Sequence, residues 1–127
     1  MTMVSDIMRK GDDIPVVTAD TLLRDALFEI TKKGIAMTSV VDHEGHAIGV
    51  FTDGDLRRLI EKRQDFSDIV IRDVMSKNPR TIAADKLAAE AVSIMEKFRI
   101  NQLLVTDDNG KLIGALHIHD LTVAKVI

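Results

Sequence analysis

The residues with the most evident chemistry lie in the stretch 49–58, which reads GVFTDGDLRR. An apolar run ends there at Thr52, and a helical pattern begins directly behind it. Backbone N–H groups at the start of a helix lack intrahelical partners, and the helix dipole favours anions at that point. The Thr52 hydroxyl could therefore reach a phosphate, and the Asp55 carboxylate could accept hydrogen bonds from two ribose hydroxyls. The same Thr-x-x-Asp spacing is also that of a capping box, in which both side chains serve only the backbone.

The stretch recurs 65 residues later as GALHIHDL, residues 114–121. Asp120 stands where the first copy has Asp55, whereas His117 replaces Thr52. Histidine is not a standard hydroxyl cap, so the retained aspartate weakens a purely capping interpretation and favours a ligand-binding one. Both interpretations stay open on the sequence alone.

The composition limits the classes of partner. The chain has 127 residues, 46% of them hydrophobic, so it can bury a core as one domain or as two small units. It has no cysteine, which excludes thiolate zinc sites and is compatible with the cytoplasm. No apolar run approaches the roughly 18 residues of a membrane span. The net charge is −3, the basic residues are dispersed, and Trp and Tyr are absent, so we expect a small-molecule partner and no nucleic acid.

The repeat extends over the whole chain, and each copy predicts the order β-α-β-β-α over about 60 residues. Asp20 and Asp85 are the expected caps of the first helices, Gly34 ends one of these helices, and Asp108-Asn109-Gly110 indicates a hairpin turn. One copy alone buries too little surface to be stable. The sequence therefore predicts an α+β fold in which two β-α-β-β-α units form a pseudo-symmetric pair packed sheet to sheet. The expected segments are repeat 1 at 4–62, a connector at 63–70 and repeat 2 at 71–127.

This pattern resembles a tandem pair of CBS domains, from Val4 to Ile127. The more specific resemblance is to the C-terminal CBS pair of D-arabinose 5-phosphate isomerases. It is carried by DIM at 6–8, GDDIP at 11–15, FTDGDLRR at 51–58 and HIHDL at 117–121.

In that family, catalysis belongs to a separate N-terminal sugar-isomerase (SIS) domain, which nothing in this chain matches. The resemblance implies the regulatory part of a longer enzyme, without isomerase activity of its own. The parent enzyme would convert ribulose 5-phosphate to arabinose 5-phosphate for Kdo, a component of lipopolysaccharide or capsule.

The resemblance further implies two clefts that bind nucleotides, each built from both copies. Carried over by position, the first cleft would use Thr52 and Asp55 with Thr81, Ile82 and Gln102. The second cleft would use His117 and Asp120 with Val16, Val17 and Met37. The alternative for Val17, Met37 and Ile82 is ordinary core packing.

We expect the effector to be CMP-Kdo ahead of an adenine nucleotide (AMP or ATP), and no other cofactor is expected. CMP-Kdo carries two negative charges that need cationic or N–H partners, and Arg57, Arg58, His117 and His119 stand at the two junctions. For Arg57 and Arg58 the alternative is a solvated helix face.

Two other functions stay open. His117, His119 and Asp120 could form a metal site, with His43 and His46 in the corresponding turn of the other copy. The pair could also be a purely structural dimerisation module with empty clefts. In either regulatory or structural form we expect a homodimer that associates through its helices, whose apolar surface exceeds what one small sheet needs.

Overall fold

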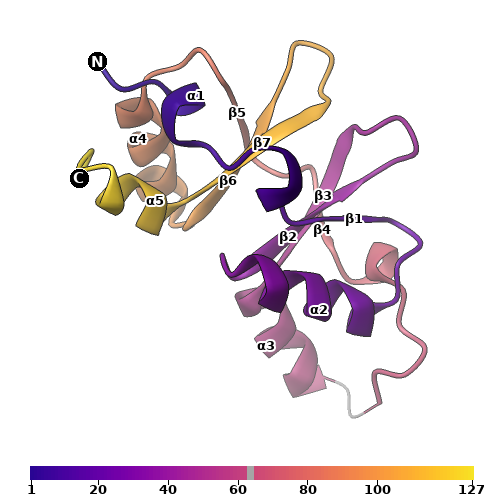
Figure 1. Ribbon diagram of the computed structural model, residues 1–127. Coiled ribbons are helices and arrows are strands. Elements are labelled where there is room, and N and C mark those ends of the chain that lie inside the picture. The colour runs from indigo at the N-terminus through magenta and orange to yellow at the C-terminus, as the bar shows by residue number, and fades with distance from the viewer. Residues whose placement is uncertain (63–64) are drawn as a thin grey trace. The chain divides into compact units, whose positions relative to one another are not determined.

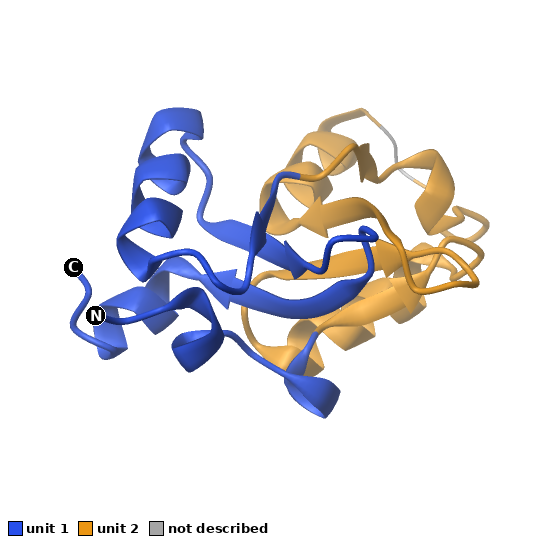
Figure 2. Cartoon of the chain, turned by 90° about the horizontal axis from the view of Figure 1, so that it is seen from above, with its two compact units in different colours: residues 1–14, 80–127 blue, residues 15–79 orange. Residues whose placement is uncertain are grey.

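The computed structural model describes residues 1–62 and 65–127 and divides them between two units, which Figure 2 distinguishes by colour. Unit 1 contains residues 1–14 and 80–127, and unit 2 contains residues 15–79. The units therefore do not follow the order of the repeats, because the first 14 residues fold with the second repeat. Residues 63 and 64, the first two of the expected connector, lie outside the described residues.

Unit 2 is built on a four-stranded sheet with the order β1-β2-β3-β4. Strand β1 runs parallel to β2, and the other two pairs are antiparallel. A short 3₁₀ helix, Ile71–Asp73, precedes β4. The elements, labelled in Figure 1, are β1 Val16–Thr18, α2 Leu23–Lys33, β2 Met37–Val41, β3 Ala47–Thr52, α3 Asp53–Lys62 and β4 Ser76–Lys77.

Unit 1 repeats this arrangement on a three-stranded sheet, β5-β6-β7, with β5 and β6 parallel and β6 and β7 antiparallel. Its N-terminal segment adds a 3₁₀ helix, Gly11–Asp13. The elements are α1 Val4–Ile7, β5 Thr81–Ala83, α4 Ala88–Phe98, β6 Gln102–Thr106, β7 Leu112–His117 and α5 Ile118–Val123. The predicted α+β class and the β-α-β-β-α order of both copies are confirmed, whereas β4 and α1 were not predicted.

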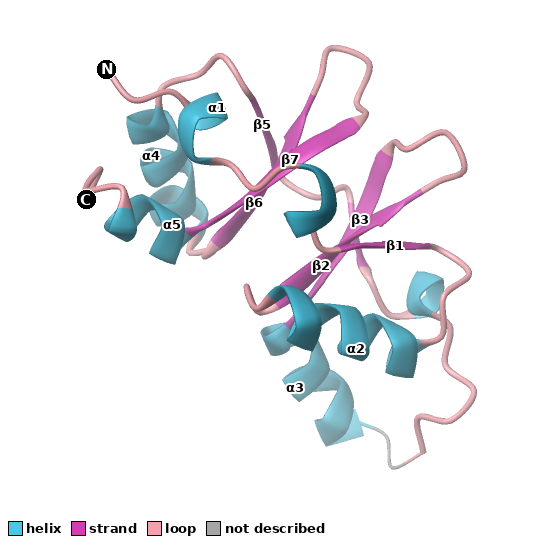
Figure 3. Ribbon diagram, in the orientation of Figure 1, coloured by secondary structure: helices cyan, strands magenta, loops and turns pink. Residues whose placement is uncertain are grey.

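The longer helices of each unit lie on one side of its strands (Figure 3). In unit 2, Ala26 and Ile30 of α2 pack with Phe51 of β3 in one core. In unit 1, the corresponding core contains Ala91 and Met95 of α4 with Leu116 of β7. These residues are at most 7% exposed, and the pairs are related by the 65-residue repeat. The apolar periodicity of the sequence therefore reflects two equivalent cores.

The expected caps at Asp20 and Asp85 are wrong. Helix α2 begins after Leu22 and α4 after Leu87, and neither of these residues provides a side-chain hydrogen bond. Carbonyl groups from distant segments accept from the first helical N–H groups instead. Leu23 N–H donates to the carbonyl oxygen of Ile69 at 2.8 Å, and Ala88 N–H donates to that of Thr2 at 2.9 Å.

Gly34 ends α2 as predicted, with a left-handed φ of 77°. Arg99 takes the same place at the end of α4, with a φ of 54°. A left-handed residue at this point lets its N–H reach back to the last turn of the helix. The N–H groups of Gly34 and Arg99 donate to the carbonyl oxygens of Ile30 and Met95.

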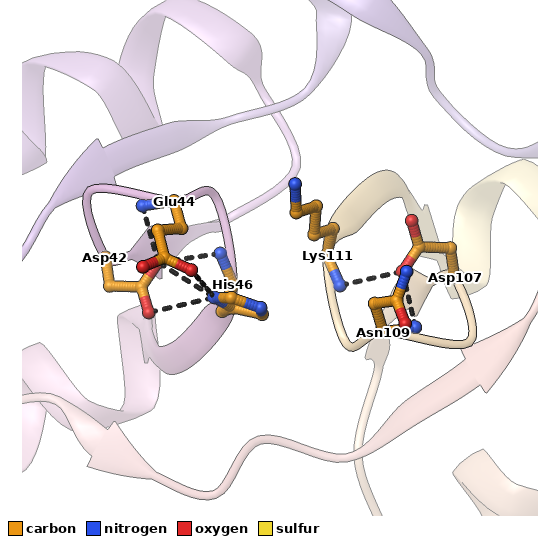
Figure 4. A network of polar contacts seen from close by, with 6 residues as sticks. All are labelled: Asp42, Glu44, His46, Asp107, Asn109 and Lys111. Carbon is orange, nitrogen blue, oxygen red and sulfur yellow. Dashed lines mark hydrogen bonds and ion pairs between the residues drawn. The ribbon is translucent and has the colours of Figure 1, made fainter.

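The turns of the two hairpins are held by aspartates (Figure 4). In unit 2, Asp42 Oδ1 accepts from the N–H groups of Glu44 and His46, each at 2.9 Å. The His46 N–H above all, with the Glu44 N–H and the His46 ring, holds the pKa of Asp42 below its usual range, although burial opposes this.

In unit 1, Asp107 Oδ1 accepts from the N–H groups of Asn109 and Lys111, at 2.9 and 3.0 Å (Figure 4). Gly110, with a φ of 80°, takes the left-handed position, and Asn109 does not. The predicted hairpin is confirmed, but its turn depends on Asp107 and Gly110, not on a left-handed Asn109.

Each unit is completed by a segment at the start of the other repeat. We call residues 2–9 the N-terminal clip and residues 69–76 the central clip. Val4 N–H donates to the carbonyl oxygen of Lys86, and Ile71 N–H donates to that of Thr21, both at 2.8 Å. Val4 and Ile71 are fully buried in the cores of units 1 and 2. The two clips thus attach in the same way.

The clips explain why the first residue of each motif, Gly49 or Gly114, is a glycine. Met8 of the N-terminal clip lies against Gly114, and Met75 of the central clip lies against Gly49. A Cβ atom on Gly49 would lie 2.4 Å from the Met75 sulfur, and one on Gly114 would lie 2.6 Å from the Met8 sulfur. No side chain fits at either position unless the methionine moves.

We predict that Gly114→Ala lowers the free energy of unfolding by about 1–3 kcal/mol, the usual cost of overpacking. The new Cβ would also lie 3.0 Å from the carbonyl oxygen of Arg9, which is backbone and cannot move as easily as a side chain. Gly49→Ala should cost less, because its close contacts are all with the flexible Met75. Urea denaturation measures both changes, and a Gly114→Ala variant as stable as the parent would contradict the account.

Candidate functional site

The junction of β3 and α3 forms a capping box. Thr52 ends β3, and its N–H donates to Asp55 Oδ2 at 3.0 Å. The Asp55 N–H donates to Thr52 Oγ1 at 3.2 Å. Each side chain thus satisfies a backbone donor of the other residue, as the capping interpretation predicts.

The Asp55 carboxylate has two further partners. Its Oδ1 accepts from Arg58 Nη2 at 2.6 Å, one helical turn further along α3. The Ser76 hydroxyl of the central clip lies 3.3 Å from Oδ1 and 3.4 Å from Oδ2. The side chain of Asp55 is 13% exposed, whereas that of Arg58 is 66% exposed. An exposed cation is therefore held on a largely buried carboxylate.

Gly54 lies beside these groups, at a position where a Cβ atom would make only ordinary van der Waals contacts. A Cβ atom at this position would lie 3.4 Å from Arg58 Nη1 and 3.6 Å from Thr52 Oγ1. A hydroxyl, a carboxylate and a guanidinium therefore converge at the start of the ten-residue helix α3. Arg57 is exposed and forms no ion pair with any residue that the structure describes.

The junction of β7 and α5 forms the corresponding box. His117 N–H donates to Asp120 Oδ2 at 3.0 Å, and His119 N–H donates to His117 Nδ1 at 3.0 Å. His117 therefore does cap its helix, and the inference that a histidine weakens the capping interpretation is wrong. The imidazole lone pair takes the part that the hydroxyl oxygen takes in the first copy.

Arg9 of the N-terminal clip binds Asp120 with two hydrogen bonds. Arg9 Nε donates to Oδ2 at 3.2 Å, and Nη2 donates to Oδ1 at 3.0 Å. Arg9 was not among the residues predicted for the site. The sequence signal that could have identified Arg9 is the repeat at the start of each copy, where Arg9 follows Met8 just as Ser76 follows Met75. Arg9 and Ser76 each contact the motif aspartate of their unit.

His117 is kept neutral by its surroundings. Burial lowers its pKa, the Asp120 carboxylate opposes this effect, and the nearby His119 and Arg9 lower the pKa further. A neutral ring suits the cap, because only an unprotonated Nδ1 accepts the His119 N–H.

The remaining candidate residues lie on strands. In the sheet of unit 2, Met37 is the partner of Thr52; in that of unit 1, Gln102 is the partner of His117. These neighbours are brought together within their units, and the predicted crosswise clefts stay a prediction. The others are Val16 and Val17 on β1, paired with Ser39 and Val40, and Thr81 and Ile82 on β5, paired with Leu104 and Val105.

These strand residues differ in how far they are buried. Met37 and Ile82 are buried, and Val17 packs against the core of unit 2. Val16 is 37% exposed, and Thr81 is exposed as well. Packing in the core is therefore the visible role of Ile82 and Val17 in this structure.

The metal alternative has no geometric support. Across residues 1–62 and 65–127, no group of three or more His, Cys, Asp or Glu side chains is arranged to hold an ion. His117 Nδ1 is engaged by the His119 N–H, and His119 is exposed. His46 Nδ1 lies 3.1 Å from Asp42 Oδ2 at a hairpin turn. Within the same residues, no helix has the length and apolar character to cross a membrane.

Comparison with known proteins identifies both repeats. The CBS domain family matches residues 4–62 and again residues 71–126. Arabinose 5-phosphate isomerase KdsD of Pseudomonas aeruginosa is 44% identical over 124 residues, and its Yersinia pestis counterpart is 41% identical. Each alignment covers 98% of this chain but 38% of the relative, so the chain spans well under half of their length.

Solved structures share the fold. CBSX2 in complex with AMP matches with a TM-score of 0.83 and 26% identity, covering 99% of this chain and 97% of that one. A structure of CBSX2 from Arabidopsis thaliana matches with a TM-score of 0.81 and 27% identity, covering 98% and 94%. The CBS domain pair of protein MJ0100 reaches a TM-score of 0.87 at 21% identity, covering 99% and 97%, which establishes the fold alone.

We predict that His117 makes the stability depend on pH. Its pKa is lowered in the folded chain, so below about pH 6.5 the unfolded chain takes up a proton that the folded chain resists. The stabilisation is therefore present above this pH and is lost as the pH falls through the folded-state pKa. The stabilisation that His117 contributes should not exceed the free energy of one helix cap, about 0.5–2 kcal/mol.

His117→Asn is the matched variant, since asparagine caps well and does not titrate in this range. Thermal unfolding of parent and variant between about pH 8 and pH 5 measures the difference. The parent should lose more stability on acidification than the variant. Parallel pH profiles would show that His117 is not the titrating group.

Proposed function

This chain is a tandem pair of CBS domains, and from that premise we propose that it binds a nucleotide and regulates an arabinose 5-phosphate isomerase. Relatives with this name are 41–44% identical over nearly the whole chain and are much longer. In the proposal, the remainder of the enzyme includes the N-terminal SIS domain that performs the isomerisation. The chain alone is then a regulatory part that does not turn over the sugar phosphate.

The observation that carries the proposal is the convergence of Thr52, Asp55 and Arg58 at the start of α3. A phosphate there would receive the Thr52 hydroxyl and the field of the ten-residue helix. Ribose hydroxyls would donate to Asp55. Arg58 is already held within 2.6 Å of that carboxylate, and its exposed side chain can turn to the phosphate when the ribose arrives.

The junction of β7 and α5 could bind a nucleotide in the same way, but more weakly. Helix α5 has six residues, and Asp120 is already paired with Arg9. Because Nδ1 of His117 accepts a hydrogen bond, the neutral ring carries its proton on Nε2, which can donate to an anion. We therefore place the primary site at Asp55. The strand residues assigned to the clefts by family resemblance remain proposals.

AMP is the first candidate ligand, because CBSX2, at 26% identity, was solved in complex with AMP. CMP-Kdo is the second candidate, as the feedback signal of a Kdo pathway leading to lipopolysaccharide or capsule. Its phosphodiester and carboxylate would require both Arg57 and Arg58, which adjoin the site.

We predict that the effector raises the melting temperature. A ligand at about 100 times its dissociation constant adds roughly 2.7 kcal/mol of stability, a shift of several degrees for a chain of this size. The series is AMP, ATP, CMP and freshly made CMP-Kdo at matched salt. No shift with any of them would contradict nucleotide binding and favour a purely structural module.

Asp55→Ala should abolish the shift, because it removes the acceptor of the ribose hydroxyls. Asp53→Ala is the matched control, since Asp53 is an exposed carboxylate in the same helical turn. Loss of binding in both variants would indicate only a change of net charge.

We further propose a homodimer that forms through the helices. Phe28 of α2 and Ile60 of α3 are 71% and 56% exposed, and Val123 of α5 is 67% exposed. Association through these helices would remove their apolar side chains from water, which is favourable. Sedimentation should give a dimer for the parent and a shift towards monomer for Phe28→Glu, and a monomeric parent at high concentration would contradict the proposal.

A further inference from the structure

The N-terminal clip is attached to unit 1 at two separate places. Near its start, the N–H groups of Val4 and Ser5 donate to the carbonyl oxygens of Lys86 and Ala84, at 2.8 and 3.0 Å. Val4 is fully buried. Near its end, Arg9 N–H donates to the Ala115 carbonyl oxygen at 2.8 Å, and Ala115 N–H donates back at 3.2 Å. The first attachment rests on burial in the core, whereas the second is a short piece of strand pairing.

The second attachment is reinforced by a charge. The bidentate pair between Arg9 and Asp120 joins the end of the clip to the motif carboxylate. Their side chains are 29% and 16% exposed, so the pair is only partly screened by solvent. The central clip makes the equivalent contact through the uncharged Ser76, at 3.3 Å from Asp55. The two clips are therefore attached alike but held with different strength.

The acceptors of Asp120 are largely occupied. Oδ2 accepts from both His117 N–H and Arg9 Nε, and Oδ1 accepts from Arg9 Nη2. A carboxylate has about four acceptor positions. Any hydroxyl pair that takes this carboxylate must displace Arg9, because the His117 N–H bond belongs to the fold of the junction.

We propose that the Arg9–Asp120 pair is a latch that couples occupancy of Asp120 to attachment of the end of the N-terminal clip. The ligand half of this statement rests on the proposed function, while the latch itself is a property of the chain alone. When Arg9 leaves Asp120, residues 8 and 9 at the end of the clip lose their charged anchor, and Val4 stays buried. A ligand that binds to Asp120 therefore opens the end of the N-terminal clip locally.

Amide hydrogen exchange measured by NMR tests the latch at single residues. The readout is the exchange rate of the Arg9 and Ala115 amides divided by that of Val4, which cancels changes in global stability. In Arg9→Gln this ratio should rise about three- to tenfold, in keeping with the loss of a bidentate charged pair. Arg9→Lys should fall in between, since it retains the charge but not the paired geometry.

Arg72→Gln is the matched control, because Arg72 forms an ion pair with Asp20 in unit 2. It should leave the ratio unchanged. An Arg9→Gln ratio equal to that of the parent would overturn the latch.

The coupling is tested by adding AMP to the parent until the amide resonance of Asp120, which reports occupancy of that carboxylate, stops shifting. The exchange ratio should rise towards the Arg9→Gln value. An unchanged ratio, with or without a shift of the Asp120 resonance, would overturn the coupling and leave the proposed function at Asp55 standing. The absence of any melting shift with the nucleotide series would overturn the proposed function and the coupling together, while Arg9→Gln still decides the latch.

Discussion

The arrangement of each unit depends on one carboxylate placed three residues after the end of a strand. Asp55 and Asp120 each accept the N–H of the last strand residue and thereby fix the angle at which the following helix begins. Asp55 also receives Arg58 and Ser76 of the central clip, and Asp120 receives Arg9 of the N-terminal clip. Strand, helix and clip thus meet at a single acidic group, whose loss costs a cap and an ion pair together. A ligand that binds there acts on all three elements.

Because of the clips, each unit depends on a segment from the other repeat. Helices α2 and α4 lack a partner for their first N–H group, and the motif glycines lack a cover, until the clip from the start of the other repeat is in place. Carbonyl groups of Thr2 and Ile69 supply the caps, and Met8 and Met75 cover the glycines. A single repeat, cut at its sequence boundaries, would lack these partners and leave part of its core uncovered.

Local signals in the sequence predicted much of the fold. The alternating and helical apolar patterns located the strands and helices, and Gly34 marked a helix end because a left-handed residue was needed there. The caps expected at Asp20 and Asp85 failed because partners distant in sequence replace them, and no local pattern shows this. His117 was misjudged because an imidazole can act as an acceptor when burial keeps it neutral. Arg9 was missed because its role appears only when its clip is laid against Asp120.

The central claim is that the motif carboxylate changes partners when a nucleotide binds. Its most direct test is a crystal structure of this chain grown with saturating AMP. The account predicts both ribose hydroxyls within hydrogen-bonding distance of Asp55, the Thr52 hydroxyl on the phosphate, and Arg58 moved from the carboxylate to the phosphate. A bound nucleotide that leaves the 2.6 Å contact between Arg58 and Asp55 intact, with its ribose elsewhere, would contradict the claim.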